Sequence, residues 1–502
     1  MIYILKDYLK ALENNGLDPK YTLSDAEQSK KVTSVTFDSR EAKDGTLFIC
    51  KGASFRPQYA KSALASGAIA CVGENAIEGA DPFIVVNNIR HAMAILAQMF
   101  YENAPAELVT IGITGTKGKS TTAHFMRSVL DDYLLSSERK ETGLISTIET
   151  YDGVERFESH LTTPESLDVY KHCRNAVNSG MDHMIMELSS QALKYERVEG
   201  VHFNIGCFLN IGEDHISPVE HADFEDYFSS KLRIFDISDC VCVNSSSEHF
   251  ERIKAYADGK CKVVTFGTDP EDDIFCTDIE KRDGNTHFKV RTPAYESEMI
   301  LEIPGLYNVS NALGVVAMSY VLGIPEKYVR SGLQKAKVPG RNDVIESHDK
   351  NVVGIVSYAH NKLSFDATFQ SVQVEYPGKK IIAVFGAAGG RAEIRRRDLP
   401  MTAEKYCDLI LVTEDDPGTE PLEKICSEIA ENISKCPFEV IYDRGEAIKR
   451  AVLDDSIGPR VIVATGKGDS SYMARGLGYV DYPSDVQLFR EYISEYDRRV
   501  KE

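Results

Sequence analysis

The chain has 502 residues, of which 43% are hydrophobic and 27% are charged, and its formal net charge is −20. This length allows several domains of roughly 100–200 residues, with the composition of an ordinary soluble protein. The acidic balance, with no compensating block of lysine and arginine, excludes a typical nucleic-acid binder. No apolar run reaches the roughly 18 residues of a membrane-spanning helix, so we expect no membrane partner.

The N-terminal segment and the cysteines indicate a cytoplasmic protein. The segment MIYILKDYLKALENNG carries charge from Lys6 onward and lacks the apolar core and cleavage site of a signal peptide. The 11 cysteines are scattered without a CxxC pair. Cys240 and Cys242 alternate in a strand-like run, which predicts buried, reduced thiols.

Residues 1–106 are predicted to form a small N-terminal α/β domain. Short strands are expected in VTSVTFDSR, GTLFIC, GAIACVG and PFIVVNN, with a helix near His91–Tyr101. The segments Asp38-Ser39-Arg40 and Lys51-Gly52 follow the first two strands. Taken alone, these are turn residues.

The stretch LVTIGITGTKGKSTT, residues 108–122, predicts a phosphate-binding loop between a strand and a helix. The strict P-loop pattern fails because Ile113 occupies the place of its first glycine. Instead the glycines are three apart, at Gly112, Gly115 and Gly118. Lys119 is expected to reach the outer phosphates and Ser120 to bind Mg²⁺.

Residues 107–338 are predicted to form a central domain with a parallel sheet. The apolar strand HMIMEL carries Glu187 near its carboxyl end, and the strand FNIGCFLNI is followed at once by Glu213-Asp214-His215. Ligands collect beyond the carboxyl ends of parallel strands, so Glu187 and His215 should share a crevice with the phosphate loop. Short strands around turns in residues 262–304 predict an antiparallel appendage.

Lys231 lies on the apolar stripe of the predicted helix ADFEDYFSSKLRIF. Its stem could cover hydrophobic surface while the ammonium reaches water. Alternatively, the lysine is chemically recruited to the site. The residues alone leave both explanations open.

The remaining sequence predicts a helix and a third domain. The helix spans residues 306–322, with Asn308 and Asn311 near its start, where asparagines often serve only as caps. A hinge at VPGR leads into residues 339–502, which are expected to form a second, Rossmann-like doubly wound sheet. Its glycine loop VFGAAGGR is weak evidence for a dinucleotide, because no acidic residue stands at a ribose position.

Motifs along essentially the whole chain resemble those of the Mur ligases, and most closely the branch that adds the third residue of the peptidoglycan stem peptide. In order they are GITGTKGKSTT, LTTPESLD, MELSSQALKYERV, FLNIGEDHISPVEH, DYFSSK, YNVSNAL, VPGR, SYAH, EDDP and GKG. The resemblance implies an α/β protein of three domains that bind the UDP moiety, ATP and the amino acid. It also implies an acyl phosphate, formed when ATP phosphorylates UDP-MurNAc-L-Ala-D-Glu and attacked by the incoming amine to release ADP and phosphate.

The resemblance also assigns catalytic roles. A carboxylate that attacks a γ-phosphate brings anion onto anion, so cations must neutralise both groups. Lys119 and Mg²⁺ meet this need, with Ser120 and Glu187 holding the first ion and His215 a second. Lys231 matches the family's carbamoylated lysine, whose anionic carbamate would help to hold the second metal.

The resemblance also implies which residues bind ATP and the UDP-linked substrate. The ATP set implied by the resemblance is Gly115, Thr116, Lys117, Gly118, Lys119, Ser120, Thr121, Asn308, Asn311, Arg341 and His360. The set for the UDP-MurNAc-dipeptide is Ser39, Thr162, Thr163, Ser189 and Arg197.

Departures from the family pattern bear on the added amino acid. Members that add diaminopimelate carry DNPR, whereas this chain has Asp415-Asp416-Pro417-Gly418, and an acidic pair favours a cationic far end, as in lysine or ornithine. Asp469 follows GKG and could also serve an ammonium, although all three aspartates could be surface loop acids. One arginine after the glycine loop should bind the α-carboxylate, with Arg391 and Arg396 as candidates. Ser357 replaces an aspartate that many members have.

The sequence therefore predicts a monomeric, ATP-dependent ligase that adds L-lysine to UDP-MurNAc-L-Ala-D-Glu in peptidoglycan precursor synthesis. The same scaffold could instead add diaminopimelate or ornithine. A folylpolyglutamate synthase is a more distant possibility, against which the long N-terminal domain argues. From another class, the chain could be a nucleotide-gated binding protein that hydrolyses ATP slowly.

Overall fold

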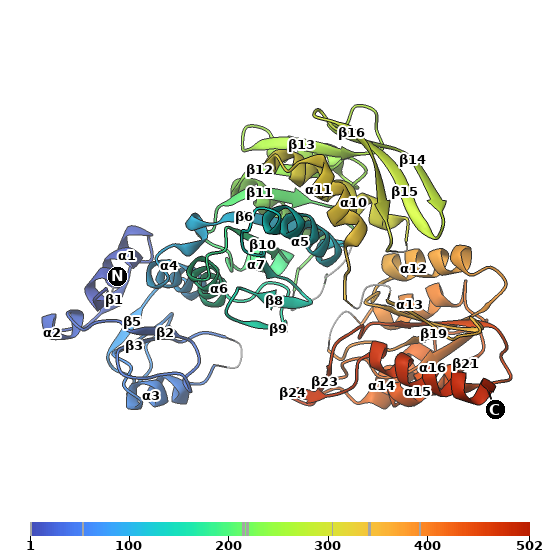
Figure 1. The fold of residues 1–502 in the computed structure, drawn as a ribbon. Helices are drawn as coiled ribbons and strands as arrows, with labels where there is room; N and C mark the ends of the chain where they lie inside the picture. The colour runs from blue at the N-terminus through green and yellow to red at the C-terminus, as the bar shows by residue number, and fades with distance from the viewer. Residues whose placement is uncertain are drawn as a thin grey trace.

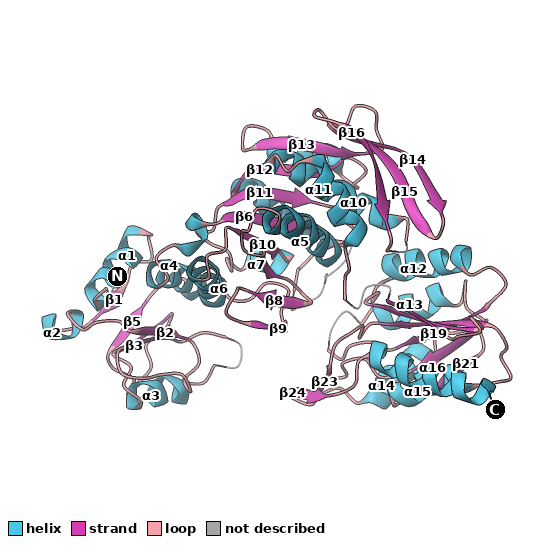
Figure 2. Ribbon diagram, in the orientation of Figure 1, coloured by secondary structure: helices cyan, strands magenta, loops and turns pink. Residues whose placement is uncertain are grey.

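The computed structural model describes residues 3–52, 55–212, 216, 220–303, 305–339, 343–390 and 393–501. Three large sheets follow one another along the chain, and helices cover them (Figures 1 and 2). This confirms the predicted three-part α/β architecture, although the exact domain limits remain predictions. Within the described residues, no helix combines the length and apolar character that crossing a membrane requires.

The N-terminal sheet has the strand order β1-β5-β4-β3-β2, and all pairs except β1–β5 are parallel. Its strands are β1 (Lys20–Tyr21), β2 (Ser34–Thr36), β3 (Thr46–Ile49), β4 (Ala70–Gly73) and β5 (Phe83–Val85). Its helices are α1 (Leu5–Asn14), α2 (Asp25–Gln28), α3 (Pro57–Ala65), α4 (Ile89–Phe100) and η1 (Ala104–Glu107). The predicted strands and helix are confirmed, and α4 begins where the Asn88 side chain accepts hydrogen bonds from two backbone N–H groups.

The central sheet has eleven strands in the order β16-β15-β14-β13-β12-β11-β6-β10-β7-β8-β9. The strands are β6 (Val109–Thr114), β7 (Gly143–Ile145), β8 (Glu149–Tyr151), β9 (Arg156–Glu158), β10 (His183–Glu187), β11 (Phe203–Phe208), β12 (Ser238–Asn244), β13 (Lys262–Gly267), β14 (Ile274–Arg282), β15 (Asn285–Arg291) and β16 (Glu296–Leu301). The antiparallel appendage is therefore the continuation of one sheet, and it begins at β14, because β13 pairs in parallel with β12.

Apolar side chains alternate between the two faces of this sheet and bury both of them. Met184 and Met186 of β10 point into the core beneath α6 (Ser166–Asn178), α7 (Ser190–Lys194), α8 (Phe224–Leu232), η2 (Arg233–Asp236) and α9 (Phe250–Ala257). Ile185 points into the core beneath α5 (Lys119–Leu135), α10 (Tyr307–Leu322) and α11 (Glu326–Lys335). Cys240 and Cys242 are buried free thiols in the second core, as predicted. A sheet covered on both faces exposes its ends, where the loops lie.

The C-terminal sheet has the order β17-β18-β22-β19-β20-β21 and is parallel except for β17. Its strands are β17 (Asp343–Glu346), β18 (Val352–Ser357), β19 (Lys380–Phe385), β20 (Leu409–Val412), β21 (Phe438–Val440) and β22 (Arg460–Thr465), beside a hairpin of β23 (Tyr472–Arg475) and β24 (Gly478–Asp481). The helices α12 (Lys362–Glu375), α13 (Arg395–Ala403) and α14 (Leu422–Ala430) cover one face, and α15 (Arg444–Leu453) and α16 (Asp485–Lys501) the other. The doubly wound sheet is confirmed, with β17 and the hairpin as additions.

A buried ion pair fixes the end of the C-terminal sheet where the predicted amino-acid residues lie. Arg444 and Asp485 are fully buried, and Arg444 donates through Nε and Nη2 to the Asp485 carboxylate at 2.7 Å each. Arg444 also donates to the carbonyl oxygens of Thr465 and Glu414 at 2.8 and 3.3 Å. One guanidinium thus joins the loops after β20 and β22 to the start of α16.

We expect Asp485→Ala to lower the free energy of unfolding by about 3–5 kcal/mol, because it leaves the buried Arg444 charge without its partner. Chemical denaturation measures the change. The control is Glu495→Ala, which removes an exposed pair with Arg499 on the same helix and should cost less than about 1 kcal/mol. Equal losses in the two variants would contradict this account of the pair.

Candidate active site

The phosphate loop lies between β6 and α5, as the sequence predicts. Gly115 and Gly118 have φ values of 155° and 86°, which favour glycine. A Cβ atom on Gly118 would lie 2.2 Å from Oδ1 of Asn311, so this turn also requires glycine for space. The loop therefore brings its backbone and the N-terminus of α5 directly against α10.

Two lysines bind the same backbone oxygen of this loop. Lys119 Nζ donates to the carbonyl oxygens of Gly115 and Thr116 at 2.9 and 3.3 Å. Lys231 Nζ, from α8, donates to the Gly115 oxygen at 3.0 Å. Amino groups from two different helices, α5 and α8, therefore converge on this loop beside the N-terminus of α5.

Lys231 is only 1% exposed, and its Nζ lies 4.8 Å from the centre of the Tyr227 ring. An ammonium that reaches water from an apolar surface is therefore the wrong explanation for this lysine. The Lys231 amino group instead ends on the Gly115 carbonyl oxygen of the phosphate loop.

Ser120 and Glu187, the predicted holders of the first Mg²⁺, are in contact. Ser120 Oγ donates to Glu187 Oε2 at 3.0 Å, and both residues are buried. Glu187 also accepts from the backbone N–H and the hydroxyl of Thr147 at 2.9 and 3.1 Å. Thr147 lies between β7 and β8 and has no counterpart among the predicted residues. His215 lies outside the described residues.

Asn311 lies directly against the phosphate loop at Gly118, and Asn308 lies beside Asn311. Both are buried, and Asn311 Nδ2 donates to Asn308 Oδ1 at 3.0 Å. The N-cap of α10 is Leu306, with no side-chain cap hydrogen bond, so the explanation of these asparagines as helix caps is wrong. His360 follows β18 and places Nδ1 2.7 Å from the carbonyl oxygen of Tyr358, whereas Arg341 lies outside the described residues.

The rest of the predicted ATP set lies in the same loop or in the first turn of α5. Thr116 Oγ1 is 2.9 Å from the Tyr227 hydroxyl, and Lys117 exchanges hydrogen bonds with the side chain of Asn210 at 2.8 and 3.1 Å. Thr121 is buried in the first turn of α5. Tyr227 and Asn210 were not predicted as site residues, although both occur inside the quoted motifs.

Four residues of the predicted dipeptide set gather at the carboxyl end of β10. Thr163 Oγ1 donates to the Glu187 carbonyl oxygen at 2.7 Å and accepts from the Ser189 N–H at 3.1 Å. The hydroxyl oxygens of Thr162 and Thr147 lie 3.0 Å apart, and Arg197 Nη1 donates to the Thr163 carbonyl oxygen at 3.0 Å. The Ser189 hydroxyl caps α7 by accepting from the Ala192 N–H.

A cationic cluster joins the N-terminal part to this end of β10. Lys51 pairs with Glu165, and Arg197 Nη2 lies 3.2 Å from the same carboxylate. The side chains are 9%, 17% and 12% exposed for Lys51, Glu165 and Arg197. Burial lowers the pKa of Lys51, and Glu165 opposes that change. The sequence predicted Lys51 only as a turn residue.

Ser39 lies in a separate turn, in which Arg40 Nε donates to the Asp38 carboxylate at 2.9 Å.

The predicted amino-acid residues take different places in the C-terminal part. Asp415 and Asp416 follow β20, and a Cβ atom on Gly466 would lie 2.1 Å from Asp415 Oδ2, so the carboxylate lies directly against the GKG loop. Asp416 has φ of 49° and accepts from the Ala474 N–H at 2.8 Å. Asp469 accepts from the Ser484 hydroxyl at 2.8 Å. None of the three is fully exposed, so they are not plain surface acids.

Burial raises the pKa of Asp415 to about 7, although the nearby cations Arg444 and Lys467 lower it and the carboxylates of Asp416 and Asp485 raise it further. The carboxyl group of Asp415 therefore changes charge near neutral pH. This makes its charge state sensitive to a cationic ligand.

Arg396 has partners that the sequence did not predict. It is 3% exposed, and its guanidinium binds Glu420 at 2.6 Å and Glu428 at 2.5 Å. This contact holds the pKa of Glu420 well below its usual range. The guanidinium thus joins α13 to α14 and does not present an open fork to a carboxylate. Arg391 lies outside the described residues.

The fold and this site define a P-loop enzyme, and comparisons with known proteins identify its family. The Mur ligase middle domain matches residues 113–319, and the Mur ligase glutamate ligase domain matches residues 340–468. The UDP-N-acetylmuramoyl-L-alanyl-D-glutamate--L-lysine ligase of Enterococcus faecalis is 35% identical over 482 residues, which cover 94% of each chain. The chain therefore belongs to the Mur ligase family of ATP-dependent ligases.

Solved structures share the fold. A UDP-N-acetylmuramoyl-L-alanyl-D-glutamate--2,6-diaminopimelate ligase matches with a TM-score of 0.66 at 21% identity and covers 99% of both chains. A folylpolyglutamate synthase from Thermotoga maritima matches with a TM-score of 0.56 at 16% identity and covers 80% of this chain and 93% of its own. At these identities the likeness concerns the fold alone.

We expect Gly118→Ala to weaken ATP binding at least about tenfold, because the new methyl group meets Asn311 and the backbone is left-handed there. Calorimetry with a non-hydrolysable ATP analogue measures the affinity. The matched control is Gly259→Ala, where φ is +72° but nothing lies within 4 Å of the added Cβ. If both variants bind like the wild type, the close approach of Gly118 and Asn311 has no role in the nucleotide site.

Proposed function

We propose that this ligase adds L-lysine to the D-glutamate of UDP-MurNAc-L-Ala-D-Glu, with ATP consumed and ADP and phosphate released. The observation that carries the proposal is the meeting of Lys119, Lys231 and the Ser120–Glu187 pair at the carboxyl ends of β6 and β10. Relatives such as the Enterococcus faecalis protein are named for this reaction. The proposal places the chain in the cytoplasm, as a monomer, in peptidoglycan precursor synthesis.

The chemistry of the donors fits Mg²⁺, because the Ser120 hydroxyl and the Glu187 carboxylate are hard oxygen ligands at the strand ends. Bound Mg²⁺ would neutralise phosphate oxygens during phosphoryl transfer. Lys119 is to leave the Gly115 and Thr116 carbonyls and bind the outer phosphates. Lys231, as a carbamate, and His215 are the proposed ligands of a second ion.

The cluster of Lys51, Arg197 and Glu165 supports a site for the anionic UDP-linked substrate. Two cationic side chains share one carboxylate there, so the cluster retains positive charge in an acidic protein. A pyrophosphate would find donors from both the N-terminal and the central parts. Ser39, Thr162, Thr163 and Ser189 are the proposed neutral contacts of the same substrate.

The choice of lysine rests on the acidic loop after β20. Asp415 and Asp416 offer negative charge to a distal ammonium, and Asp469 lies on the neighbouring loop. Gly418, with φ of 56°, occupies the place of the arginine found in diaminopimelate-adding members, so a distal carboxylate loses its expected partner. Arg391 is the remaining candidate for the α-carboxylate, since Arg396 is bound to two glutamates.

The rival functions fit the structure less well. A diaminopimelate adder would need a cation where this chain has Gly418. A nucleotide-gated binding protein would have no use for a buried lysine on the phosphate loop. The folylpolyglutamate synthase fold covers less of this chain than the diaminopimelate ligase fold does.

Phosphate release in the presence of ATP, Mg²⁺ and UDP-MurNAc-L-Ala-D-Glu distinguishes these functions. We expect L-lysine to stimulate release, L-ornithine to do so more weakly and meso-diaminopimelate to have little effect, because only the first two end in a lone cation. Omission of the UDP-linked substrate is the control. Stimulation by diaminopimelate alone would contradict the assigned specificity, and no stimulation by any amino acid would contradict the ligase reaction itself.

The pKa of Asp415 predicts a pH dependence of lysine binding. The folded protein keeps Asp415 neutral below about pH 7 and ionises it above, so KM for L-lysine should fall as pH rises through 7, by up to about tenfold per unit on the acidic side. Steady-state kinetics between pH 6 and 8 measure it. Asp415→Asn should raise KM and flatten the profile, whereas Asp481→Asn, at an exposed position, should keep it. An unchanged profile in Asp415→Asn would contradict this role.

A further inference from the structure

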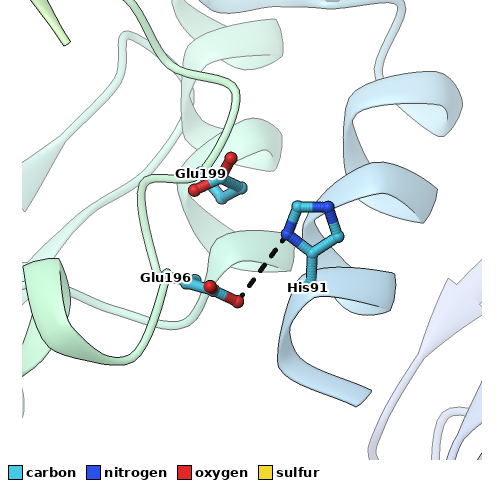
Figure 3. A group of neighbouring side chains, drawn as sticks. All are labelled: His91, Glu196 and Glu199. Atoms are coloured by element: carbon cyan, nitrogen blue, oxygen red, sulfur yellow. Dashed lines mark ion pairs between the residues drawn. The ribbon is translucent and has the colours of Figure 1, made fainter. Parts of the chain in front are cut away.

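Three side chains converge where the N-terminal part meets the central part. His91 lies in the first turn of α4, and Glu196 and Glu199 lie in the loop after α7 (Figure 3). His91 Nδ1 is 3.7 Å from Glu196 Oε2, and one potential ligand atom from each residue lies within 4.8 Å of the other two. All three residues are half-buried.

The donor set is that of a transition-metal dication. One imidazole nitrogen and two carboxylate oxygens suit Zn²⁺, Co²⁺ or Mn²⁺, whereas Mg²⁺ and Ca²⁺ prefer oxygen alone. Metal–ligand bonds of roughly 2.0–2.2 Å in a tetrahedron separate neighbouring ligand atoms by about 3.4 Å. The observed 3.7 Å between nitrogen and oxygen is close to this value, so small side-chain rotations would complete the set.

A second cluster shows what a purely structural group of this composition looks like. Asp152 accepts from His172 Nδ1 and Asn175 Nδ2 at 2.7 and 2.8 Å and from two backbone N–H groups, and Glu155 binds Lys171. Its acceptor oxygens are already occupied, which leaves little for a metal.

The His91 cluster differs in this respect. Glu196 accepts from Asn88 Nδ2 at 3.2 Å, and within the part of the chain that the structure describes the Glu199 carboxylate makes no hydrogen bond or ion pair. The carboxylate oxygens of Glu196 and Glu199 and the imidazole of His91 therefore face one another, and lone pairs on the carboxylates remain available to a metal. This is the arrangement that a cation completes.

We propose that His91, Glu196 and Glu199 form a binding site for a zinc-like divalent transition metal that joins the N-terminal and central parts. The site flanks Arg197, which contacts the Thr163 carbonyl and Glu165. A metal there fastens α4 to the segment that carries Arg197 and holds that guanidinium in place. The proposal concerns a position away from the phosphate loop and does not depend on the reaction.

Co²⁺ is the probe, because its absorption spectrum separates nitrogen and oxygen ligands from the thiolates that free cysteines could supply. We expect one Co²⁺ per chain with visible d–d bands and no thiolate charge-transfer band, displaced by Zn²⁺ but not by Mg²⁺. His91→Asn and Glu199→Gln should each weaken Co²⁺ binding at least about tenfold. Bound metal should also raise the thermal unfolding midpoint of the full-length wild type but not of these variants.

The matched control is His202→Asn, which removes a histidine of an exposed pair with Asp239 and should leave Co²⁺ affinity unchanged. Unfolding midpoints without metal show whether the variants fold. The proposal is overturned if Co²⁺ does not bind, if the spectrum shows thiolate ligation, or if folded His91→Asn protein binds Co²⁺ like the wild type.

Discussion

The carbonyl oxygen of Gly115 organises the site, because Lys119 and Lys231 both donate to it. Two amino groups that converge on one backbone oxygen at the N-terminus of α5 make this position suited to an anion. The loop has positive φ values at Gly115 and Gly118, and Asn311 of α10 lies directly against Gly118. The neighbouring strands β11, β6 and β10 of the central sheet are parallel, so their carboxyl ends lie together beside this loop.

The sequence predicted the parts of the fold that depend on local pattern. Apolar runs such as HMIMEL and RVIVATGKG became buried parallel strands, because both faces of such strands need apolar side chains. The same logic placed Glu187 at a strand end beside Ser120, where the structure has it. Acidic residues at strand ends and a phosphate loop can be located from sequence, because the carboxyl ends of parallel strands lie on the same side of the sheet.

Contacts between distant segments could not be read from pattern. Nothing in the sequence around Arg396 indicates that Glu420 and Glu428 occupy its guanidinium. The resemblance assigned Asn311 and Gly118 to one nucleotide site, but residue pattern alone does not show that they touch. The strands β7, β8 and β9, of three residues each, were not predicted, and neither was a role for Thr147. These side chains take their roles from tertiary packing.

The account depends most on Lys231, a buried lysine whose recruitment to the phosphate loop has a chemical purpose only if it helps to hold a metal beside the acyl phosphate. Turnover of Lys231→Ala, with and without added short carboxylates, tests this most directly. The account predicts a loss of kcat of roughly 10²-fold or more, partly restored when acetate or formate replaces the missing anion. A variant with a near-normal rate, or an inactive, folded variant that no carboxylate rescues, would contradict it.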